Sequence, residues 1–238
     1  MNTHVSAFSF SIITPVYNEE AIIVNSINQN LEVLEKSGVN YEMVIINDGS
    51  RDRSGELITE NFGFNDKIRI IHSHNNMGFG MAVKEGLQSA RNVYLLSIPA
   101  DSPLTTEVFD AFKAAAAKAD IVVSYRIARL GYTPRMRLNS HVYHLLIEII
   151  FDIHLVDFNW IHLYNRKVFT EGNIKITSKG IFMLAEVLIQ AQKKGYTFCE
   201  IPVAQSERLT GIASASKFSS VLKTSLEMIT FWYRFNRH

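Results

Sequence analysis

The chain has 238 residues, enough for one large domain or two small ones, and its 47% hydrophobic and 20% charged residues exclude long disordered segments. The 24 Lys and Arg residues nearly balance 23 Asp and Glu residues, so a protein built mainly to bind nucleic acid is excluded. The single cysteine, Cys199, excludes an internal disulfide and a zinc site with several cysteines, and it favours a reducing compartment.

The apolar segments are too short or too polar to cross a membrane. The first residues lack the basic segment that opens a secretory signal. A membrane-spanning helix needs about 20 predominantly apolar residues, whereas residues 142–153 are fewer and include His144, Glu148 and Asp152. We therefore expect a cytoplasmic protein, either soluble or peripheral on the inner face of the cell membrane.

Strand-like and helix-like segments alternate through the first half of the chain. Short runs rich in Val and Ile, typical of buried parallel strands, are found at residues 8–14, 41–46, 68–72, 93–98 and 121–124. Helical patterns lie between them at residues 23–34, with Asn18 as a candidate N-cap, and at 82–90 and 108–117. This alternation predicts a doubly wound α/β sheet, on which ligands bind at the carboxyl ends of the strands.

The second half begins with a basic stretch without acidic residues. Its arginines are Arg126, Arg129, Arg135 and Arg137. Such a run is either a solvated loop or a site for phosphate groups. Helices are then expected at residues 140–153 and 179–194, followed by a strand at 197–203.

The chain from residue 206 onward carries a net charge of +3 and an apolar helical pattern. The apolar residues are Phe218, Val221, Leu222, Leu226, Met228, Ile229, Trp232, Tyr233 and Phe235. This face could lie on an anionic membrane, on the core or on a second subunit of a homo-oligomer. Charge alone would supply only about 3 kcal/mol of membrane binding, so buried aromatic area would have to add to it. We expect one domain at 1–205, with halves at 1–124 and 125–205, and a mobile loop and amphipathic helix at 206–238.

Polar segments follow the predicted strands of the first half. Residues 14–20 (TPVYNEE) follow the first strand, 47–50 (NDGS) the second, and 99–103 (PADSP) the fourth. The carboxyl ends of parallel strands share one edge of the sheet, so these segments should meet there. Asp48 can accept hydrogen bonds from a nucleobase or a ribose, and Gly49 permits the tight turn.

A glycine-bearing turn at residues 75–82 opens a helix. Gly78 and Gly80 fit the beginning of a dinucleotide fingerprint, but Val83 stands in the place of the third glycine. The turn also follows the third strand instead of the first. Both departures argue against a Rossmann oxidoreductase.

Taken together and in this order, the motifs resemble those of the family 2 glycosyltransferases of the GT-A fold, most closely the polyprenyl-phosphate sugar synthases. The resemblance covers nearly the whole chain, with segments at 13–20, 45–50, 76–80, 100–101, 124–126, 137–139, 157, 163–166, 179–180, 186, 195–196, 200–203 and 208–217. It implies an α/β fold with a single Rossmann-like domain that binds a nucleotide diphospho-sugar, a mostly parallel central sheet and a C-terminal amphipathic helical arm.

The resemblance also implies roles for individual residues. The donor-binding set is Pro15, Tyr17, Glu19, Asp48, Asn76, Gly78, Ala100, Arg208 and Lys217, of which the last two are similar to a cationic pair on a closing loop. The catalytic set is Asp101, Asp157, Arg126 and Arg137. In it, Asp101 looks like the surviving acid of the DXD metal motif, which implies Mg²⁺ or Mn²⁺, and the arginines look like contacts to phosphate groups.

Several positions depart from the family pattern. Pro99 replaces the first metal-binding Asp, Pro103 stands where some relatives have a glutamine, and Asn47 replaces the first Asp of the second motif. The closing-loop motif is stretched over 208–217. With one carboxylate, a metal would need most of its ligands from the substrate, and Arg208 or Lys217 would share in stabilising the leaving diphosphate.

The acceptor decides whether the reaction needs a base. A lipid phosphate is already ionised and can attack the sugar C1 directly, with inversion. A sugar hydroxyl needs a carboxylate or a histidine, for which Asp157, Glu186, His141 and His162 are the candidates.

Three functions remain open on the sequence alone. The preferred one is an inverting glycosyltransferase with a polyprenyl-phosphate acceptor at an anionic membrane surface. The alternatives are a transferase that extends a glycan or a glycolipid with an Asp or Glu base, and a nucleotide-sugar-binding protein without turnover.

Overall fold

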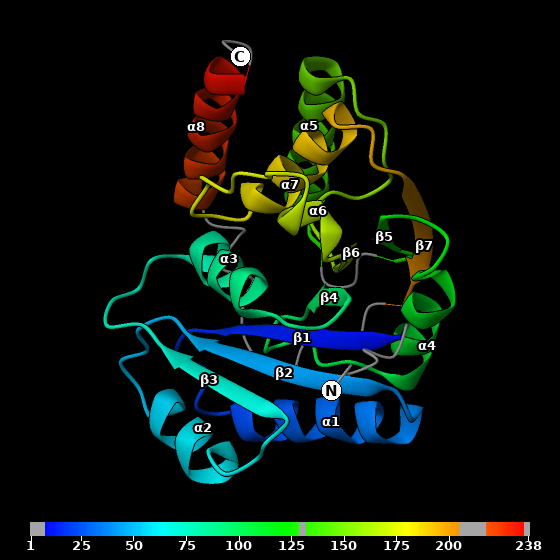
Figure 1. Ribbon diagram of the computed structural model, residues 1–238. Helices are drawn as coiled ribbons and strands as arrows, with labels where there is room; N and C mark the ends of the chain where they lie inside the picture. Colours follow the sequence, from blue (N-terminus) through cyan, green and yellow to red (C-terminus); the bar gives the residue numbers. More distant parts are fainter. Residues whose placement is uncertain (1–7, 129–131, 205–217, 236–238) are drawn as a thin grey trace.

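The structure is a computed structural model that describes residues 8–128, 132–204 and 218–235. Its strands and helices alternate along most of the chain (Figure 1). In chain order they are β1 (Ser9–Val16), α1 (Ile23–Ser37), β2 (Asn40–Asn47), α2 (Ser54–Phe62), β3 (Ile68–His72), α3 (Phe79–Ser89), β4 (Tyr94–Ser97), α4 (Thr106–Ala115), β5 (Ile121–Arg126), α5 (Pro134–Phe151), β6 (His162–Asn165), α6 (Lys167–Thr170), α7 (Phe182–Lys193), β7 (Phe198–Val203) and α8 (Phe218–Phe235).

The strands form one mixed sheet in the order β3-β2-β1-β4-β6-β5-β7. Among the strands of the described residues, only β6 runs antiparallel to its neighbours, β4 and β5; the remaining pairs are parallel. This confirms the predicted α/β fold and its mostly parallel sheet. Strand β6 was not predicted from the sequence, because a buried strand of four residues has no periodicity that distinguishes it from a loop.

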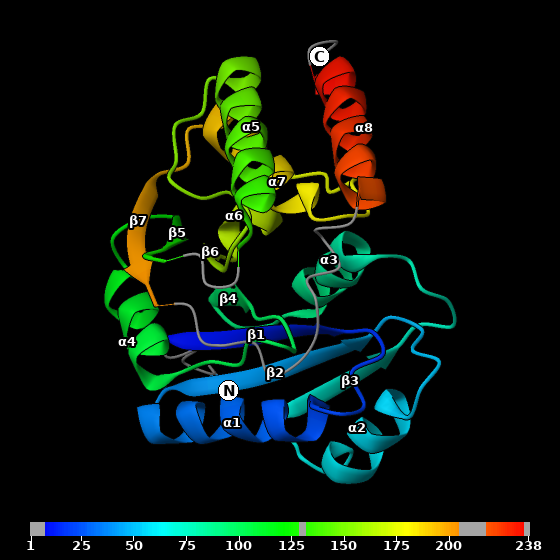
Figure 2. The same cartoon turned by 180° about the vertical axis from the view of Figure 1, so that it is seen from behind.

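Alternate side chains of each strand enter two separate apolar layers. Ile12 of β1 and Leu96 of β4 pack with α1, α2 and α4, whereas Ile13 and Leu95 pack with α3 and α7. The two layers lie on opposite faces of the sheet (Figure 2). Burial on both faces explains why the strands are continuous apolar runs.

Two helix starts differ from the prediction. Asn18 is not the N-cap of α1: it adopts a left-handed φ of 55°, and the helix begins only at Ile23. The helix expected from residue 140 begins at Pro134, where the hydroxyl of Thr133 accepts a hydrogen bond from the Met136 amide. A Thr-Pro pair at a helix start is a recognisable signal, because proline at the first helical position lacks only an amide that has no helical partner.

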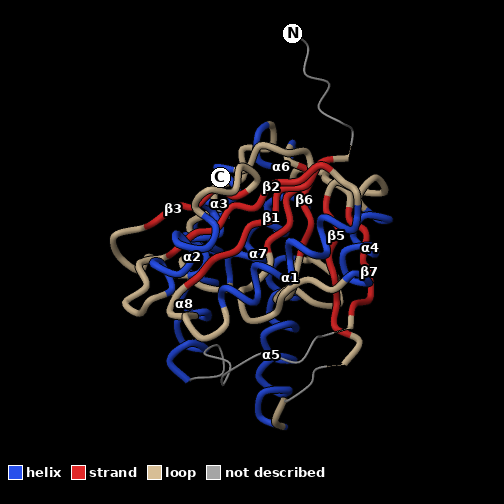
Figure 3. Tube along the Cα trace, turned by 90° about the horizontal axis from the view of Figure 1, so that it is seen from below, coloured by secondary structure: helices blue, strands red, loops and turns tan. Residues whose placement is uncertain are grey.

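The helices α5 and α8 extend together beyond the sheet (Figure 3). They meet through aromatic rings: Phe151 of α5 lies 5.6 Å from Phe231 and 6.2 Å from Phe235 of α8, measured between ring centroids. The predicted C-terminal helix is therefore partly packed on the core, with Met228 and Phe231 buried. Within the described ranges, no helix is long and apolar enough to span a membrane.

Candidate active site

The predicted donor residues follow strands that end at one edge of the sheet. Val16 at the end of β1 pairs with Asn47 at the end of β2, and Ile13 pairs with Ser97 at the end of β4. Tyr17, Asp48 and Asp101, which follow these parallel strands, consequently lie at the same edge. Tyr17 is 40% exposed there, whereas Asp48 is only 3% exposed.

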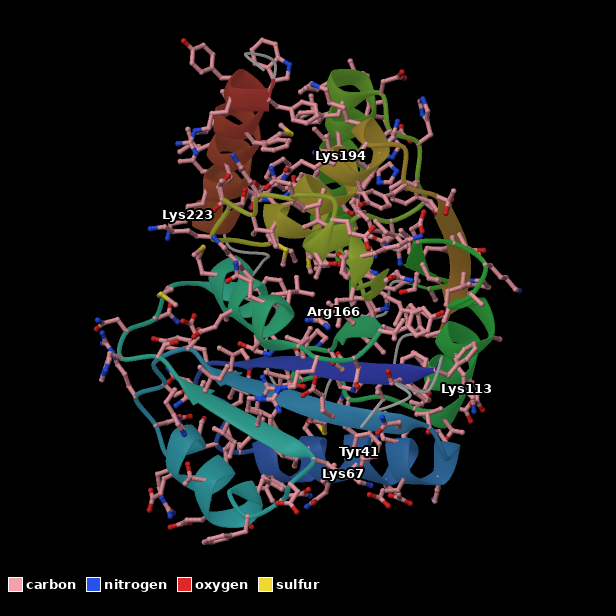
Figure 4. The ribbon with its side chains drawn as sticks, in the orientation of Figure 1. Tyr41, Lys67, Lys113, Arg166, Lys194 and Lys223 are labelled. Carbon is pink, nitrogen blue, oxygen red and sulfur yellow. The ribbon has the colours of Figure 1, made fainter. Side chains whose placement is uncertain are left out.

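The opposite edge of the sheet carries structural pairs instead. Tyr41 near the start of β2 and Lys67 just before β3 lie together, with the Lys67 ammonium 4.5 Å from the centre of the Tyr41 ring (Figure 4). Both side chains bond to Glu35 at the end of α1, at 2.6 and 2.9 Å. These contacts hold the end of α1 against the starts of β2 and β3.

The segment after β1 is held against the segment after β2 by backbone-to-side-chain bonds. The amide of Glu19 donates to the Ser54 hydroxyl at 2.8 Å, and that of Asn18 donates to the Ser50 hydroxyl at 3.0 Å. In return, the Arg51 amide donates to the Asn18 side-chain oxygen at 2.8 Å. Two of the predicted donor-binding segments are thus one structural unit, and Glu19 is half-buried within it.

Asp48 fixes the glycine turn. Its two carboxylate oxygens accept hydrogen bonds from the amides of Met77 and Gly78, at 2.8 and 2.9 Å. A carboxylate shared between two amides leaves fewer lone pairs for a base or a ribose. The structure therefore gives Asp48 a positioning role that the sequence did not show, while its predicted contact with the nucleotide stays a prediction.

Gly49 is required by both its backbone conformation and its surroundings. Its φ is +65°, and a Cβ atom there would lie 2.5 Å from the carbonyl carbon of Asn75. Gly38 offers a matched control, because its φ is +68° but a Cβ atom at that position would meet nothing within 4 Å.

Gly49→Ala should therefore destabilise the protein more than Gly38→Ala. We expect a loss of about 1–2 kcal/mol for Gly38→Ala from the left-handed backbone alone, and a further loss of about 1–3 kcal/mol for Gly49→Ala from overpacking. Urea denaturation of the two variants measures the difference. Equal losses of unfolding free energy in the two variants would show that the close contact between the turns at 47–50 and 75–78 adds nothing to stability.

Asn47 has a structural reason to differ from the Asp of the family pattern. Its side-chain amide group faces Nδ1 of His72 at 3.0 Å, and its side-chain oxygen accepts a hydrogen bond from the Ser50 amide at 3.2 Å. The other ring nitrogen of His72 faces the Thr59 hydroxyl at 3.2 Å. An ionised Asp could accept from the Ser50 amide but could not donate to Nδ1 of His72, so it would require the ring tautomer that carries its proton on Nδ1.

The start of α3 is not a phosphate cradle. The Gly78 amide is bound by Asp48, the Gly80 amide donates to the Lys179 carbonyl at 2.8 Å, and the Met81 amide bonds within the turn. A helix N-terminus binds anions through amides that lack other acceptors, and three of these amides have one. This observation agrees with the exclusion of a Rossmann dinucleotide site. Asn76 lies beside this turn and is exposed.

Asp101 is the predicted metal ligand at this edge. It is half-buried after β4, next to the buried Ala100. Over the part of the chain that the structure describes, no group of three or more His, Cys, Asp or Glu side chains could hold a metal ion. A magnesium ion commonly takes only one or two carboxylates and completes its shell with substrate phosphates and water. Asp101 fits a metal of this kind, shared with a diphosphate, but not a metal held by protein alone.

Arg126 is enclosed by a carboxylate and two aromatic rings. Its Nε and Nη2 donate to Oδ2 of Asp157 at 2.9 and 2.8 Å, and Nη1 donates to the Tyr132 hydroxyl at 2.9 Å. The guanidinium carbon lies 4.8 Å from the centre of the Trp160 ring. The side chains of Arg126 and Asp157 are each only 5% exposed. The sequence predicted both members of this pair, but not the roles of Tyr132 and Trp160, because only the reversed direction of β6 brings residues 157–160 to the end of β5.

Three of the four candidate bases are occupied or buried. Oδ1 of Asp157 accepts from the Asn159 amide at 3.0 Å, and Oδ2 is bound by Arg126. Glu186 is 0% exposed and accepts hydrogen bonds from the Thr177 and Ser178 amides. His162 is 1% exposed, and its Nε2 faces the Phe158 carbonyl at 3.2 Å. His141 is exposed on α5.

His162 should make the protein sensitive to acid. Burial lowers its pKa from 6.5 to about 4. As the pH falls, the unfolded chain therefore binds this proton first, and stability present above about pH 6.5 is lost between pH 6.5 and 4. The expected loss is about 3 kcal/mol, since one pKa unit is worth about 1.36 kcal/mol. Urea denaturation across this range measures it, and His162→Gln should flatten the slope; an unchanged slope would assign the sensitivity to other groups.

Of the remaining predicted residues, Pro15 directly precedes the last residue of β1 at this edge, and Arg137 lies on α5. Pro15 is half-buried within β1, and Arg137 is exposed near the start of α5, beside the exposed Arg135. Arg208, Lys217 and Arg129 lie outside the described residues, so their predicted roles stay predictions.

Comparison with known proteins agrees with this architecture. The family model for glycosyl transferase family 2 matches residues 11–185. The "uncharacterized glycosyltransferase YkcC" of Bacillus subtilis is 28% identical over 235 residues, covering 97% of this chain and 69% of the relative. The dolichyl-phosphate beta-glucosyltransferase ALG5D of Trichomonas vaginalis is 32% identical over 96 residues, covering 38% of this chain but only 29% of the relative. AglD of Haloferax volcanii is 23% identical, and the chain spans 37% of its length.

A solved structure shares the fold. It is glucosyl-3-phosphoglycerate synthase from Mycobacterium tuberculosis, with a TM-score of 0.73, 14% identity, and coverage of 95% of this chain and 79% of that one. The mostly parallel sheet, with its polar turns at the carboxyl edge, defines a GT-A fold. The chain belongs to glycosyl transferase family 2 and is a glycosyltransferase.

Proposed function

We propose that the protein transfers a sugar from a nucleotide diphospho-sugar to a polyprenyl phosphate, with inversion at C1. In this reaction a phosphate oxygen of the acceptor attacks C1 from the face opposite the leaving group. The bond between C1 and the diphosphate oxygen breaks, and its electron pair leaves with the nucleotide diphosphate. The donor would lie along the edge defined by Tyr17, Asp48 and Asp101. Solved relatives of the same fold were crystallised with UDP or UDP-glucose, which supports a donor of this class.

The observation that carries the proposal is the state of the candidate bases. Asp157 is bound by Arg126 and by a backbone amide, and Glu186 and His162 are buried inside the protein. A hydroxyl acceptor needs a base within hydrogen-bond reach, whereas a phosphate is already ionised. Three of the four candidate bases are therefore unsuited to a hydroxyl acceptor, which favours an acceptor that is already ionised; the exposed His141 is the candidate base for the alternative. The name of the Trichomonas relative, a dolichyl-phosphate glucosyltransferase, supports the same class of acceptor.

Arg126 would stabilise phosphate charge at this edge. Its guanidinium is oriented by Asp157, Tyr132 and Trp160 before any substrate binds, so little reorganisation is needed when negative charge develops. A divalent ion held by Asp101 and the donor phosphates would neutralise further charge. The solved relative was crystallised with Mn²⁺, which supports a divalent metal.

A membrane surface is the proposed location of the acceptor. Five large apolar side chains of α5 and five of α8 are exposed: Leu138, Val142, Leu145, Leu146 and Ile149, and Leu222, Leu226, Ile229, Trp232 and Tyr233. Tryptophan and tyrosine favour the boundary between lipid and water. Lys223 projects outward from α8 (Figure 4) and would meet anionic headgroups.

A product assay tests this function. The protein is incubated with Mn²⁺, a polyprenyl phosphate in anionic vesicles and either UDP- or GDP-sugars, and release of nucleotide diphosphate is measured. We expect release only with the lipid phosphate, and loss of vesicle binding in an Ile229→Ser, Trp232→Ser double variant. The outcome that would contradict the proposal is transfer to the hydroxyl of a polyprenol or a sugar. If His141→Gln abolished that transfer, the protein would be a base-dependent transferase. Nucleotide binding without release under any condition would leave only a binding protein.

A further inference from the structure

Residues 177–180, called the strap below, join three helices at the donor edge of the sheet. The strap precedes α7 and contains no regular secondary structure. Its four consecutive backbone amides all donate to carboxylates. Those of Thr177 and Ser178 donate to Glu186 of α7 at 2.9 and 2.8 Å, and those of Lys179 and Gly180 donate to Oε1 of Glu227 of α8, both at 2.9 Å.

The other side of the strap supports the glycine turn. The Gly80 amide donates to the Lys179 carbonyl at 2.8 Å, and a Cβ atom on Gly78 would lie 2.6 Å from the same carbonyl oxygen. A Cβ on Gly80 would overlap the Ser178 carbonyl oxygen. The start of α3 therefore packs directly on the backbone of the strap, and Asp48 holds the same turn from the opposite side. A shift of the strap must move the turn.

Glu227 is the link between the strap and the apolar arm. Its neighbours on α8, Leu226 and Met228, point to different surroundings: Leu226 is 55% exposed, whereas Met228 is 4% exposed in the core. The second oxygen of Glu227, Oε2, is buried, and no hydrogen-bond partner for it is found in the described part of the protein.

The attachment of the strap to α8 combines favourable and unfavourable contributions, while Met228 and Phe231 bury α8 in the core. Two good hydrogen bonds from backbone amides favour the docked position, and the buried unpaired oxygen opposes it. Of the two carboxylates that hold the strap, Glu186 is fully buried, so the one on α8 is the one that motion of the arm can release.

We propose that Glu227 is a positioning residue that couples the docking of α8 to the affinity for the nucleotide donor. With α8 docked, its carboxylate fixes Lys179 and Gly180, and through them the turn at residues 78–80. The inference rests on the proposed donor site at this edge. Because coupling between two equilibria is reciprocal, nucleotide binding should stabilise the docked arm by the same factor. An arm that contacts lipid through Leu226 and Ile229 would thereby sense whether the donor is bound.

Calorimetric titration with UDP and with GDP in the presence of Mn²⁺ tests the coupling. Compared with the wild type, Glu227→Ala should raise the Kd of the bound nucleotide roughly five- to tenfold, the lower range of known couplings. Glu227→Gln keeps one oxygen acceptor and should recover part of this loss, which also provides a result if the alanine variant does not fold. Thr230→Ala is the matched control on α8, because its exposed hydroxyl bonds within the helix, to the Leu226 carbonyl. It should leave the Kd unchanged.

Hydrogen exchange provides the readout that a merely structural role would not give. Nucleotide should slow exchange of the Lys179, Gly180 and Gly80 amides in the wild type but not in Glu227→Ala. The inference is wrong if Glu227→Ala frees the amides of Lys179 and Gly180 while nucleotide affinity is unchanged, or if Thr230→Ala weakens binding as much. If the wild type binds neither UDP nor GDP, the proposed donor site is wrong. This result differs from the two that contradict the coupling, since both of those require a wild type that binds nucleotide.

Discussion

Asp157→Asn is expected to lower both stability and turnover. The change keeps the volume of the side chain but leaves the Arg126 guanidinium, only 5% exposed, without its opposite charge. Removal of one member of a buried ion pair typically costs about 3–5 kcal/mol of folding free energy. Turnover should fall about 10²–10³-fold, because the guanidinium would no longer be held ready for the developing phosphate charge. Urea denaturation and kcat measure the two effects.

The control and the pH profile separate a positioning role from a base. Glu32→Gln breaks the exposed pair between Glu32 and Lys36 and should change stability by less than about 1 kcal/mol, with no change in kcat. Arg126→Lys keeps the charge but not the two-pronged contact, so it should resemble Asp157→Asn in kcat. If Asp157 were the general base, its variant would lose stability in the same way, but it would also lose the acidic limb of the pH–rate profile. That result would contradict the assignment of an ionised acceptor.

Asp101→Asn is expected to abolish most of the transfer while leaving the fold intact. The residue is half-buried in a turn, so its isosteric replacement should have little effect on unfolding. Loss of a preorganised contact to the leaving diphosphate costs about 3–4 kcal/mol of barrier, or a factor of about 10²–10³ in kcat. Nucleotide affinity should fall in the presence of Mn²⁺ and stay the same in EDTA, since only the metal joins Asp101 to the phosphates in this proposal.

Asp110→Asn, an exposed residue on α4, is the matched control and should behave as the wild type. Transfer at full rate in EDTA would remove Asp101 as a metal ligand. The positive charge at the leaving group would then have to come from arginine and lysine side chains alone, and the replacement of the first metal-binding Asp by Pro99 would be explained.

Most strands of the sheet could be predicted from the sequence, because a strand buried on both faces is a continuous apolar run. The five parallel strands of the first half and the strand at 198–203 are apolar runs, and each was placed within a few residues. The four-residue strand β6 was not predicted, because it is too short to display a period. The nine-residue α2 was also not predicted, although its buried residues Ser54, Ile58 and Phe62 recur at helical spacing. The N-cap at Asn18 was wrong because its side chain bonds to the amide of Arg51, 33 residues away, instead of to the helix beside it.

For the site, the sequence determined which residues lie at the strand ends, because strand direction in an alternating α/β chain dictates which turns share an edge. Tyr17, Asp48 and Asp101 were identified in this way, whereas the role of Arg126 was implied by the family resemblance. Only the tertiary structure decided how these groups are held. The bond of Asp157 to Arg126 spans 31 residues and that of Glu227 to Gly180 spans 47, and both depend on the path of the chain in space. Local pattern fixes where a side chain stands along its own element, but the partner that neutralises or orients it is chosen by packing between distant elements.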